Sequence, residues 1–341
     1  MDKFRSDPEA PGRARWRVPG RAVMAALLLG ACSTLTKCTA PPSLGAEERA
    51  QHYVEPLAPP PSGLRVFHLG HSLVGRDMPA MIEQLASAAG IAGHSYASQL
   101  GWGTSLREHW DPDLPINGFE VENDHPRFMD ARAALQGGDF DAFVMTEMVE
   151  LRDAVRYHDS GRFAGEWVRL ARSERADMRV YLYESWHRLD VAEGWLERLD
   201  NDPAELWEGT ILAQAMAQDG VGTIHVIPAG RVMAAFVRAL EAQGGLPGMR
   251  DRTDLFLRDD QGVLDPIHLD DKGLYLVALV HFTTLYHRDP RGLPHALLRA
   301  DGTPVAPVSE AVAALMQETV WQVVSGLPQS GLPQSGWAPG D

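Results

Sequence analysis

Cysteine is scarce in this 341-residue chain, which contains only Cys32 and Cys38. Residues from 64 onward therefore offer no disulfide framework, no thiolate metal cluster and no cysteine nucleophile. Basic charge is scarce too, because 31 lysines and arginines stand against 46 acidic residues and the formal net charge is −15. No basic run interrupts the body of the chain. A nucleic acid partner is therefore excluded.

The chain also lacks a long hydrophobic run, and the apolar run near its N-terminus is short. Several arginines precede the apolar stretch from Ala22 to Leu29, and Gly30-Ala31-Cys32 follows. This order predicts a signal peptide over residues 1–31. The end of the stretch, Leu29 to Cys32, resembles the bacterial lipobox, which implies a lipid on Cys32 and a membrane anchor on the periplasmic side of the cell envelope. The alternatives are an ordinary cleaved signal or a short membrane anchor, although the run is too short to span a bilayer comfortably.

Two segments flank the predicted body, which covers residues 64–324. Residues 32–63 are rich in Pro, Ala and Ser and include Pro59-Pro60-Pro61, so they predict a stiff extended tether. Residues 325–341 repeat Ser-Gly-Leu-Pro-Gln, a composition that buries nothing and predicts a disordered tail.

Short apolar runs alternate with helical spacing along the body. The predicted strands are 64–69, 94–98, 140–146, 179–184 and 223–227. The predicted helices are 77–90 with Asp77 as N-cap, 163–172, 204–218, 231–243, 272–286 and 309–324. The alternation predicts an α/β fold, namely a three-layer α/β/α sandwich with a flavodoxin-like five-stranded parallel sheet and helices on both faces. Polar residues at the carboxyl ends of its strands are the ones most informative about function.

A serine stands at the first of these strand ends, in Gly70-His71-Ser72. A helix begins closely after it, so the Ser72 hydroxyl would lie at a strand-to-helix turn near helix amides, as a nucleophile does. The alternative is a serine that merely ends a strand or caps a helix.

A carboxylate and an imidazole stand three residues apart in Asp265-Pro266-Ile267-His268. A serine hydroxyl becomes a good nucleophile when a base takes its proton, and that base works best when a carboxylate orients it. We therefore predict His268 as the base and Asp265 as its partner, with a surface turn as the alternative.

These blocks together resemble the SGNH, or GDSL-like, hydrolase superfamily, with His71 where that family often has Asp or Asn. The resemblance implies a serine esterase with a triad of Ser72, His268 and Asp265. It also implies an oxyanion hole in which the amide of Ser72 is joined by that of Gly103, with Gly101 as second choice. Both glycines would otherwise be plain turn residues.

The third block of the family departs from its usual pattern, because Thr146-Glu147 stands where an oxyanion asparagine is expected. Some carbohydrate-esterase-like branches of the superfamily carry Gln-Glu or Gln-Gly-Glu there. Thr146 and Glu147 are therefore candidates for the third oxyanion position.

Other polar and aromatic residues at strand ends are candidates for substrate binding, namely His71, Trp102, Glu184 and Trp186. Trp186 would alternatively pack against a helix, and Ser185 with His187 forms a rival nucleophile pair. The histidines show no HExxH or comparable spacing, and no phosphate loop or dinucleotide fingerprint is present, so we expect neither a metal nor a cofactor.

The sequence thus predicts a serine esterase that hydrolyses a small acyl ester, with O-acetyl groups on a glycan as the expected substrate. One alternative is a polysaccharide O-acetyltransferase with the same triad. The other is a non-catalytic lipoprotein that binds a ligand in the same crevice.

Overall fold

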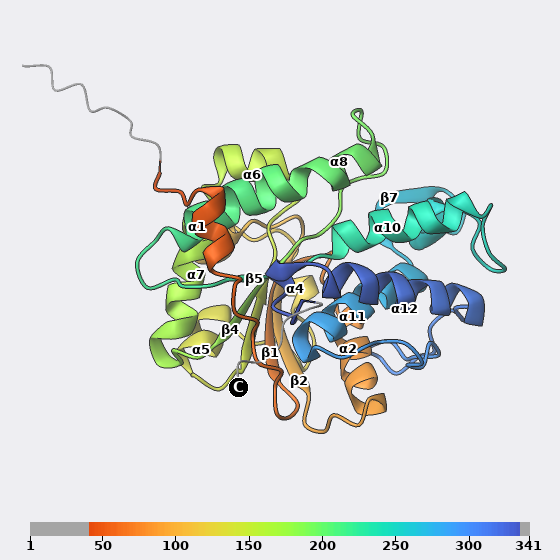
Figure 1. Cartoon of the computed structure of the whole chain (residues 1–341), viewed down its shortest axis with the longest axis horizontal. Helices are drawn as coiled ribbons and strands as arrows, with labels where there is room; N and C mark the ends of the chain where they lie inside the picture. Colours follow the sequence, from red (N-terminus) through yellow and green to blue (C-terminus); the bar gives the residue numbers. More distant parts are fainter. Residues whose placement is uncertain (1–40, 335–341) are drawn as a thin grey trace, which may run out of the picture. The chain divides into compact units, whose positions relative to one another are not determined.

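A five-stranded parallel sheet lies at the centre of the computed structural model, which describes residues 41–334 (Figure 1). The strand order β2-β1-β3-β4-β5 is that of flavodoxin-like sheets. The strands are β1 Arg65–His71, β2 Ser95–Gly101, β3 Ala142–Met145, β4 Arg179–Tyr183 and β5 His225–Ile227. The predicted α/β fold is confirmed, and all five predicted strands are present with ends that differ by a few residues.

Helices cover both faces of the sheet because successive residues of each strand belong to two separate hydrophobic clusters. In β1, for example, Val66 belongs to one cluster and Phe67 to the other. The helices on the Val66 face are α2 Asp77–Ala88, α10 Ala229–Ala242, α11 Asp271–Tyr286 and α12 Glu310–Ser325. The helices on the Phe67 face include α3 Leu106–Trp110, α5 Ala131–Gln136, α6 Leu151–Tyr157, α7 Ser160–Glu174 and α9 Ala213–Met216. These three layers form the predicted sandwich.

An antiparallel hairpin that the sequence pattern did not predict stands apart from the main sheet. It pairs β6 Phe256–Arg258 with β7 Leu264–Leu269, and β7 carries Asp265 and His268. The predicted helix 204–218 is a π-helix over Pro203–Leu212 that continues into α9. The remaining helices are α1 Ala46–Gln51, α4 Phe119–Glu122 and α8 Trp195–Asp202, with 3₁₀ turns at Arg252–Leu255 and Pro328–Ser330.

Three local predictions are wrong. Asp77 is the first residue of α2 rather than its N-cap, because its carboxylate accepts a hydrogen bond from the Ala300 amide at 2.9 Å. The part of the tether within residues 41–63 is folded, since it contains α1 and the Tyr53 hydroxyl donates to the Ile224 carbonyl at 2.7 Å. The part of the tail within residues 325–334 is folded, since the Leu332 side chain is buried in the core.

The predictions for residues 1–40 lie outside the described residues. They include the signal peptide, the lipobox and the lipidation of Cys32, all of which stay predictions. Across residues 41–334, no helix has both the length and the apolar character needed to cross a membrane.

Buried histidines lie in the core on the α11 side of the sheet. His68 of β1 and His281 of α11 have ring centroids 6.1 Å apart, and His94 bonds the Tyr286 hydroxyl at 2.6 Å. Burial lowers the pKa of His94 and of His281 to about 4. Well above pH 6.5 these rings are neutral in both the folded and the unfolded chain. Below it the unfolded chain binds protons that the folded chain does not accept until about pH 4, so stability is lost over that interval.

We expect His281→Leu to make the protein less sensitive to acid. Removing one such histidine should reduce the slope of unfolding free energy against pH by about 1.4 kcal/mol per pH unit between pH 4.5 and 6. Urea denaturation at a series of pH values measures the slope. Thr283→Val, which changes a buried residue of the same helix that carries no titratable group, is the control and should leave the slope unchanged. Equal slopes for the wild type and His281→Leu would contradict the prediction.

Candidate active site

The chain turns at Ser72, directly after β1, and His71 fixes this turn. The Val74 amide donates to the His71 carbonyl at 2.8 Å. The His71 ring is fully buried, and its Nε2 lies 2.9 Å from the Glu147 carbonyl oxygen, to which it donates. Burial lowers the pKa of His71 to about 4, so the ring is neutral at pH 7. His71 therefore holds the Ser72 turn against the loop that follows β3.

Ser72, His268 and Asp265 form a continuous hydrogen-bonded chain. Ser72 Oγ lies 3.0 Å from His268 Nε2, and His268 Nδ1 lies 2.8 Å from Asp265 Oδ2. A nucleophile within reach of a base, and a base oriented by a carboxylate, is the arrangement that activates a serine hydroxyl. The structure thus brings together three residues that lie on two elements far apart in the sequence.

The second oxygen of Asp265 shapes the turn that carries His268. Asp265 Oδ1 accepts hydrogen bonds from the amides of Ile267 at 2.8 Å and His268 at 3.0 Å. Burial alone would raise the pKa of Asp265, but these amides and the His268 ring lower it below its usual value. The carboxylate therefore stays ionised at neutral pH and is able to stabilise a protonated His268.

An open cavity of about 500 Å³ surrounds Ser72 and His268. Its other lining residues are His71, Leu73, Trp102, Gly103, Glu122, Val149, Arg188 and Ile267. Trp102 is 51% exposed, and its indole Nε1–H donates to Glu122 Oε1 at 2.6 Å. Glu122 and Arg188 give the cavity one charge of each sign.

Of the residues predicted for the oxyanion hole besides Ser72, only Gly103 lines the Ser72 cavity. Gly103 lines the Ser72 cavity and has a positive φ of 57°, which favours glycine. Gly101 is buried as the last residue of β2 and does not line the cavity. Thr146 donates its hydroxyl to the Tyr183 carbonyl at 2.8 Å, so its side chain faces β4. Glu147 is fully buried and does not line the cavity either.

Glu147 instead joins two backbone segments and lies outside the cavity lining. Its Oε1 accepts hydrogen bonds from the amides of Met148 at 2.8 Å and Leu106 at 3.3 Å. Burial raises the pKa of Glu147 to about 7 in spite of these bonds. The position where the family has an oxyanion asparagine therefore holds a structural carboxyl group that links the loop after β3 to the start of α3.

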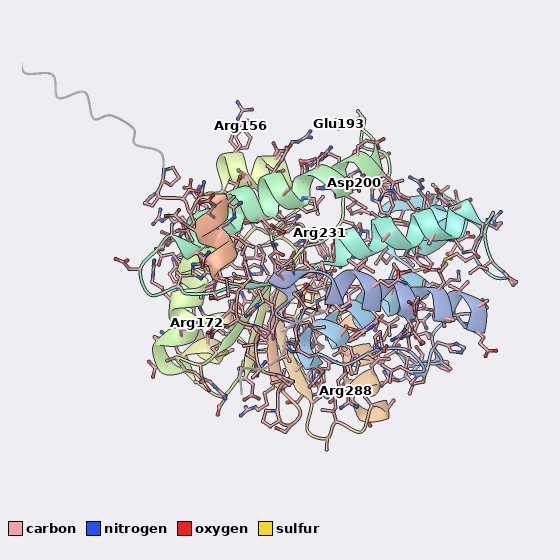
Figure 2. All side chains as sticks on the ribbon, viewed as in Figure 1. Arg156, Arg172, Glu193, Asp200, Arg231 and Arg288 are labelled. Atoms are coloured by element: carbon pink, nitrogen blue, oxygen red, sulfur yellow. The ribbon has the colours of Figure 1, made fainter. Side chains whose placement is uncertain are left out.

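Glu184 and Trp186, predicted to bind substrate, are buried and do not line the cavity. Glu184 accepts a hydrogen bond from the Arg231 amide at 3.0 Å and pairs with the Arg231 guanidinium at 3.2 Å. Figure 2 labels Arg231, which lies in the first turn of α10. Burial raises the pKa of Glu184 to about 7, although Arg231 opposes that rise. Trp186 donates its indole N–H to the Ile267 carbonyl at 2.7 Å.

The rival pair Ser185 and His187 does not lie at this cavity. His187 Nε2 instead lies 2.9 Å from Asp202 Oδ2, and both side chains are buried. Ser185 is buried as well. Of the two serines, Ser72 therefore lines the cavity and Ser185 does not.

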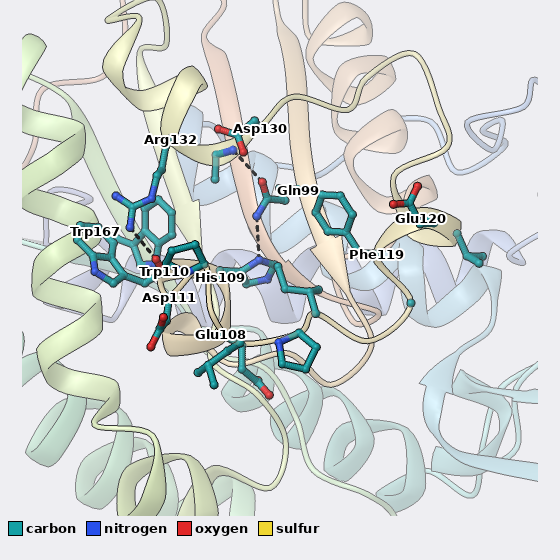
Figure 3. A pocket seen from close by; sticks show the side chains of 17 residues that line it. Gln99, Glu108, His109, Trp110, Asp111, Phe119, Glu120, Asp130, Arg132 and Trp167 are labelled. Carbon is teal, nitrogen blue, oxygen red and sulfur yellow. Dashed lines mark hydrogen bonds between the residues drawn. The ribbon is translucent and has the colours of Figure 1, made fainter.

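A second cavity, of about 630 Å³, lies beside the segment 108–121 (Figure 3). Gln99 and His109 lie in it, joined by a 3.0 Å hydrogen bond from Gln99 Nε2 to His109 Nδ1. His109 Nε2 lies 2.8 Å from the Gly70 carbonyl, to which it donates. Burial lowers the pKa of His109 to about 4, so it is neutral at pH 7. This chain of bonds supports the strand end that precedes Ser72.

The sequence did not single out Glu122, Val149, Arg188 and Ile267, which line the Ser72 cavity. Ile267 lies inside the Asp265-to-His268 block and Val149 lies just beyond Glu147, so proximity to those blocks would have suggested both. Glu122 is the last residue of the short helix α4 and Arg188 lies in the loop after β4, and neither belongs to a sequence pattern that marks a site. Within residues 41–334, no cluster of three or more His, Cys, Asp or Glu side chains is placed to hold a metal ion.

Comparison with known proteins gives similarity at the level of structure. No protein-family model and no curated protein sequence matches the chain. A DUF4886 family protein from Bacteroides uniformis is similar with a TM-score of 0.53 and 16% identity, over 77% of this chain and 95% of that one. This similarity shows a shared fold.

Two further solved structures are similar with lower TM-scores. A GDSL-like lipase from Parabacteroides merdae has a TM-score of 0.37 and 12% identity over 66% of this chain and 96% of that one. A carbohydrate esterase family 3 protein from Talaromyces cellulolyticus has a TM-score of 0.31 and 16% identity over 66% of this chain and 97% of that one.

We expect a fluorophosphonate probe to label the protein at Ser72, because the probe reacts with a serine that is hydrogen-bonded to a base. Mass spectrometry of the labelled peptide identifies the site. Asp265→Asn should slow labelling by roughly a hundredfold or more, since an amide facing His268 Nδ1 favours the wrong tautomer. Asp177→Asn, which changes an exposed carboxylate that does not line the cavity, is the control. A folded protein that does not react with the probe would contradict the prediction.

Proposed function

We propose that this protein is a serine hydrolase that cleaves carboxylic esters with Ser72, His268 and Asp265. The observation that supports this most strongly is the chain of hydrogen bonds at 3.0 and 2.8 Å that joins the three side chains beside an open cavity. Ser72 Oγ attacks the ester carbonyl carbon while His268 takes the serine proton and Asp265 stabilises the imidazolium. His268 then gives this proton to the departing alkoxide, which leaves as the alcohol.

The resulting acyl-enzyme is cleaved by water. His268 removes a proton from the water, the hydroxide attacks the acyl carbon, and the proton returns to Ser72 Oγ as the acid leaves. We assign the oxyanion to the backbone amides of Ser72 and Gly103. The Thr146 and Glu147 side chains are engaged elsewhere, so the proposal includes no side-chain donor from the loop after β3.

For the substrate we propose a small acyl ester, with an O-acetyl group on a glycan as the preferred case. Trp102 supports this choice, because a half-exposed indole offers an apolar face to the C–H groups of a sugar ring. The ring is held in place by its bond to Glu122 and by Gly118, where a Cβ would lie 2.2 Å from Trp102 Cδ2. The Glu122 carboxylate and the Arg188 guanidinium are respectively an acceptor and a donor for sugar hydroxyls.

We expect Ser72→Ala to lower kcat for p-nitrophenyl acetate by about a thousandfold or more, because the nucleophile is lost. Ser185→Ala is the matched control and should retain activity. Full hydrolysis by Ser72→Ala would refute the assignment of the nucleophile. Product analysis with an acetyl donor and a glycan acceptor separates a hydrolase from an O-acetyltransferase. A folded wild-type protein that neither hydrolyses the ester nor transfers the acetyl group would favour a ligand-binding protein.

We expect Trp102→Ala to raise KM for an acetylated oligosaccharide by about tenfold, which corresponds to the loss of roughly 1.4 kcal/mol of apolar contact. KM for ethyl acetate should not change, because ethyl acetate has no ring to lie on the indole. Steady-state kinetics with both esters measure the difference. Tyr157→Ala removes an aromatic side chain that is 58% exposed and does not line the cavity, and it serves as control. Equal effects of Trp102→Ala on both esters would argue against a sugar leaving group.

A further inference from the structure

The turn that carries His268 is bound through its carbonyls by one loop. The two residues between Asp265 and His268 are Pro266 and Ile267. The Trp186 indole N–H donates to the Ile267 carbonyl at 2.7 Å, and the Leu189 amide donates to the Pro266 carbonyl at 2.8 Å. Both donors belong to the loop that follows β4.

The N–H groups of the same turn are bound from the other side. Asp265 Oδ1 accepts the amides of Ile267 and His268, and Pro266 has no N–H to bind. Every backbone N–H and C=O group of Pro266 and Ile267 therefore has a partner. Such a turn has little freedom to move, so the direction of the His268 side chain depends on the position of the loop after β4.

Trp186 is suited to hold this turn. Its side chain is 1% exposed, and its ring lies against Tyr183 with centroids 6.5 Å apart. An indole N–H donates only, and a buried donor left without a partner costs about 1–3 kcal/mol. The ring position is therefore coupled to the position of the Ile267 carbonyl.

Buried charges anchor the loop that contains Trp186. His187 Nε2 lies 2.9 Å from Asp202 Oδ2, which also accepts a hydrogen bond from Arg198 Nε at 2.6 Å. Arg198 donates two further hydrogen bonds to Glu150 at 2.9 and 2.6 Å. Glu150 follows Val149, which lines the Ser72 cavity. The same network thus connects the loop after β4 to the cavity wall.

We infer that Trp186 is a positioning residue, which sets the orientation of His268 toward Ser72 by holding the Ile267 carbonyl. It does not line the cavity, so its contribution is to the geometry of proton transfer and not to substrate binding. This inference rests on the proposed esterase function. It assigns to Trp186 a role different from the substrate contact that its place at a strand end had predicted.

Trp186→Phe tests the inference, because it removes the N–H while keeping an aromatic ring. The matched control is Trp167→Phe, since Trp167 is 0% exposed and donates its indole N–H to the Leu106 carbonyl at 3.0 Å without bonding the loop after β4 or the turn of His268. With p-nitrophenyl acetate we expect Trp186→Phe to lower kcat by about tenfold and to leave KM within about twofold. The rate of fluorophosphonate labelling should fall in parallel. Trp167→Phe should lower the melting temperature to a similar extent and leave kcat unchanged.

A second variant covers the case in which Trp186→Phe disturbs folding. Site-specific replacement of Trp186 by 3-benzothienylalanine keeps both rings and replaces the N–H by sulfur, so it deletes the donor alone. A lower kcat with unchanged KM in this protein supports the inference. Equal kcat for the wild type and the benzothienyl protein, or an equal loss in Trp186→Phe and Trp167→Phe, would overturn it. The proposed function itself fails only if wild-type hydrolysis is absent or does not depend on Ser72.

Discussion

The candidate active site depends on the hydrogen bonds that the Asp265 carboxylate accepts. One oxygen orients the His268 ring, and the other binds the two amides that give the turn its shape. The same side chain thus fixes both the path of the backbone and the tautomer of the base. Because the amides also keep the carboxylate ionised, the geometry of the turn and its electrostatics have a single origin.

The rest of the site is arranged around that turn by elements that are distant in the sequence. Ser72 directly follows β1, where His71 and the Gly70 carbonyl are held by bonds to neighbouring segments. The loop after β4 approaches from the other side and binds the carbonyls of the turn. A parallel sheet makes this convergence possible, since the carboxyl ends of its strands lie along one edge.

Much of this arrangement is predictable from the sequence, because it depends on local patterns. Strands buried on both faces are short apolar runs, so the five strands of the sheet are readable one at a time. Gly70-His71-Ser72 follows one of these runs, and Asp265 precedes His268 by the spacing that one turn requires. Site residues that belong to short contiguous blocks are therefore predictable from the sequence.

The features that were missed depend on tertiary contacts. The short strands β6 and β7 have no alternating pattern. Residue type alone does not indicate that the Trp186 indole binds the Ile267 carbonyl instead of lining the cavity. Glu147 has the residue type of a polar site residue, but the amides of Met148 and Leu106 bind it outside the cavity lining. The Ser-Gly-Leu-Pro-Gln repeat has the composition of a disordered tail, yet Leu332 finds a place in the core.

The two ends of the folded body meet at the start of the sheet rather than at the end where Ser72 lies. The Leu57 amide donates to the Gly331 carbonyl at 2.9 Å, and Arg179, the first residue of β4, donates to the Ala58 carbonyl at 2.7 Å. These two hydrogen bonds join the segment around residue 57 to the C-terminal segment and to the amino end of β4. The hairpin that carries Asp265 and His268 takes part in neither, so the closure of the chain ends and the candidate active site use separate contacts.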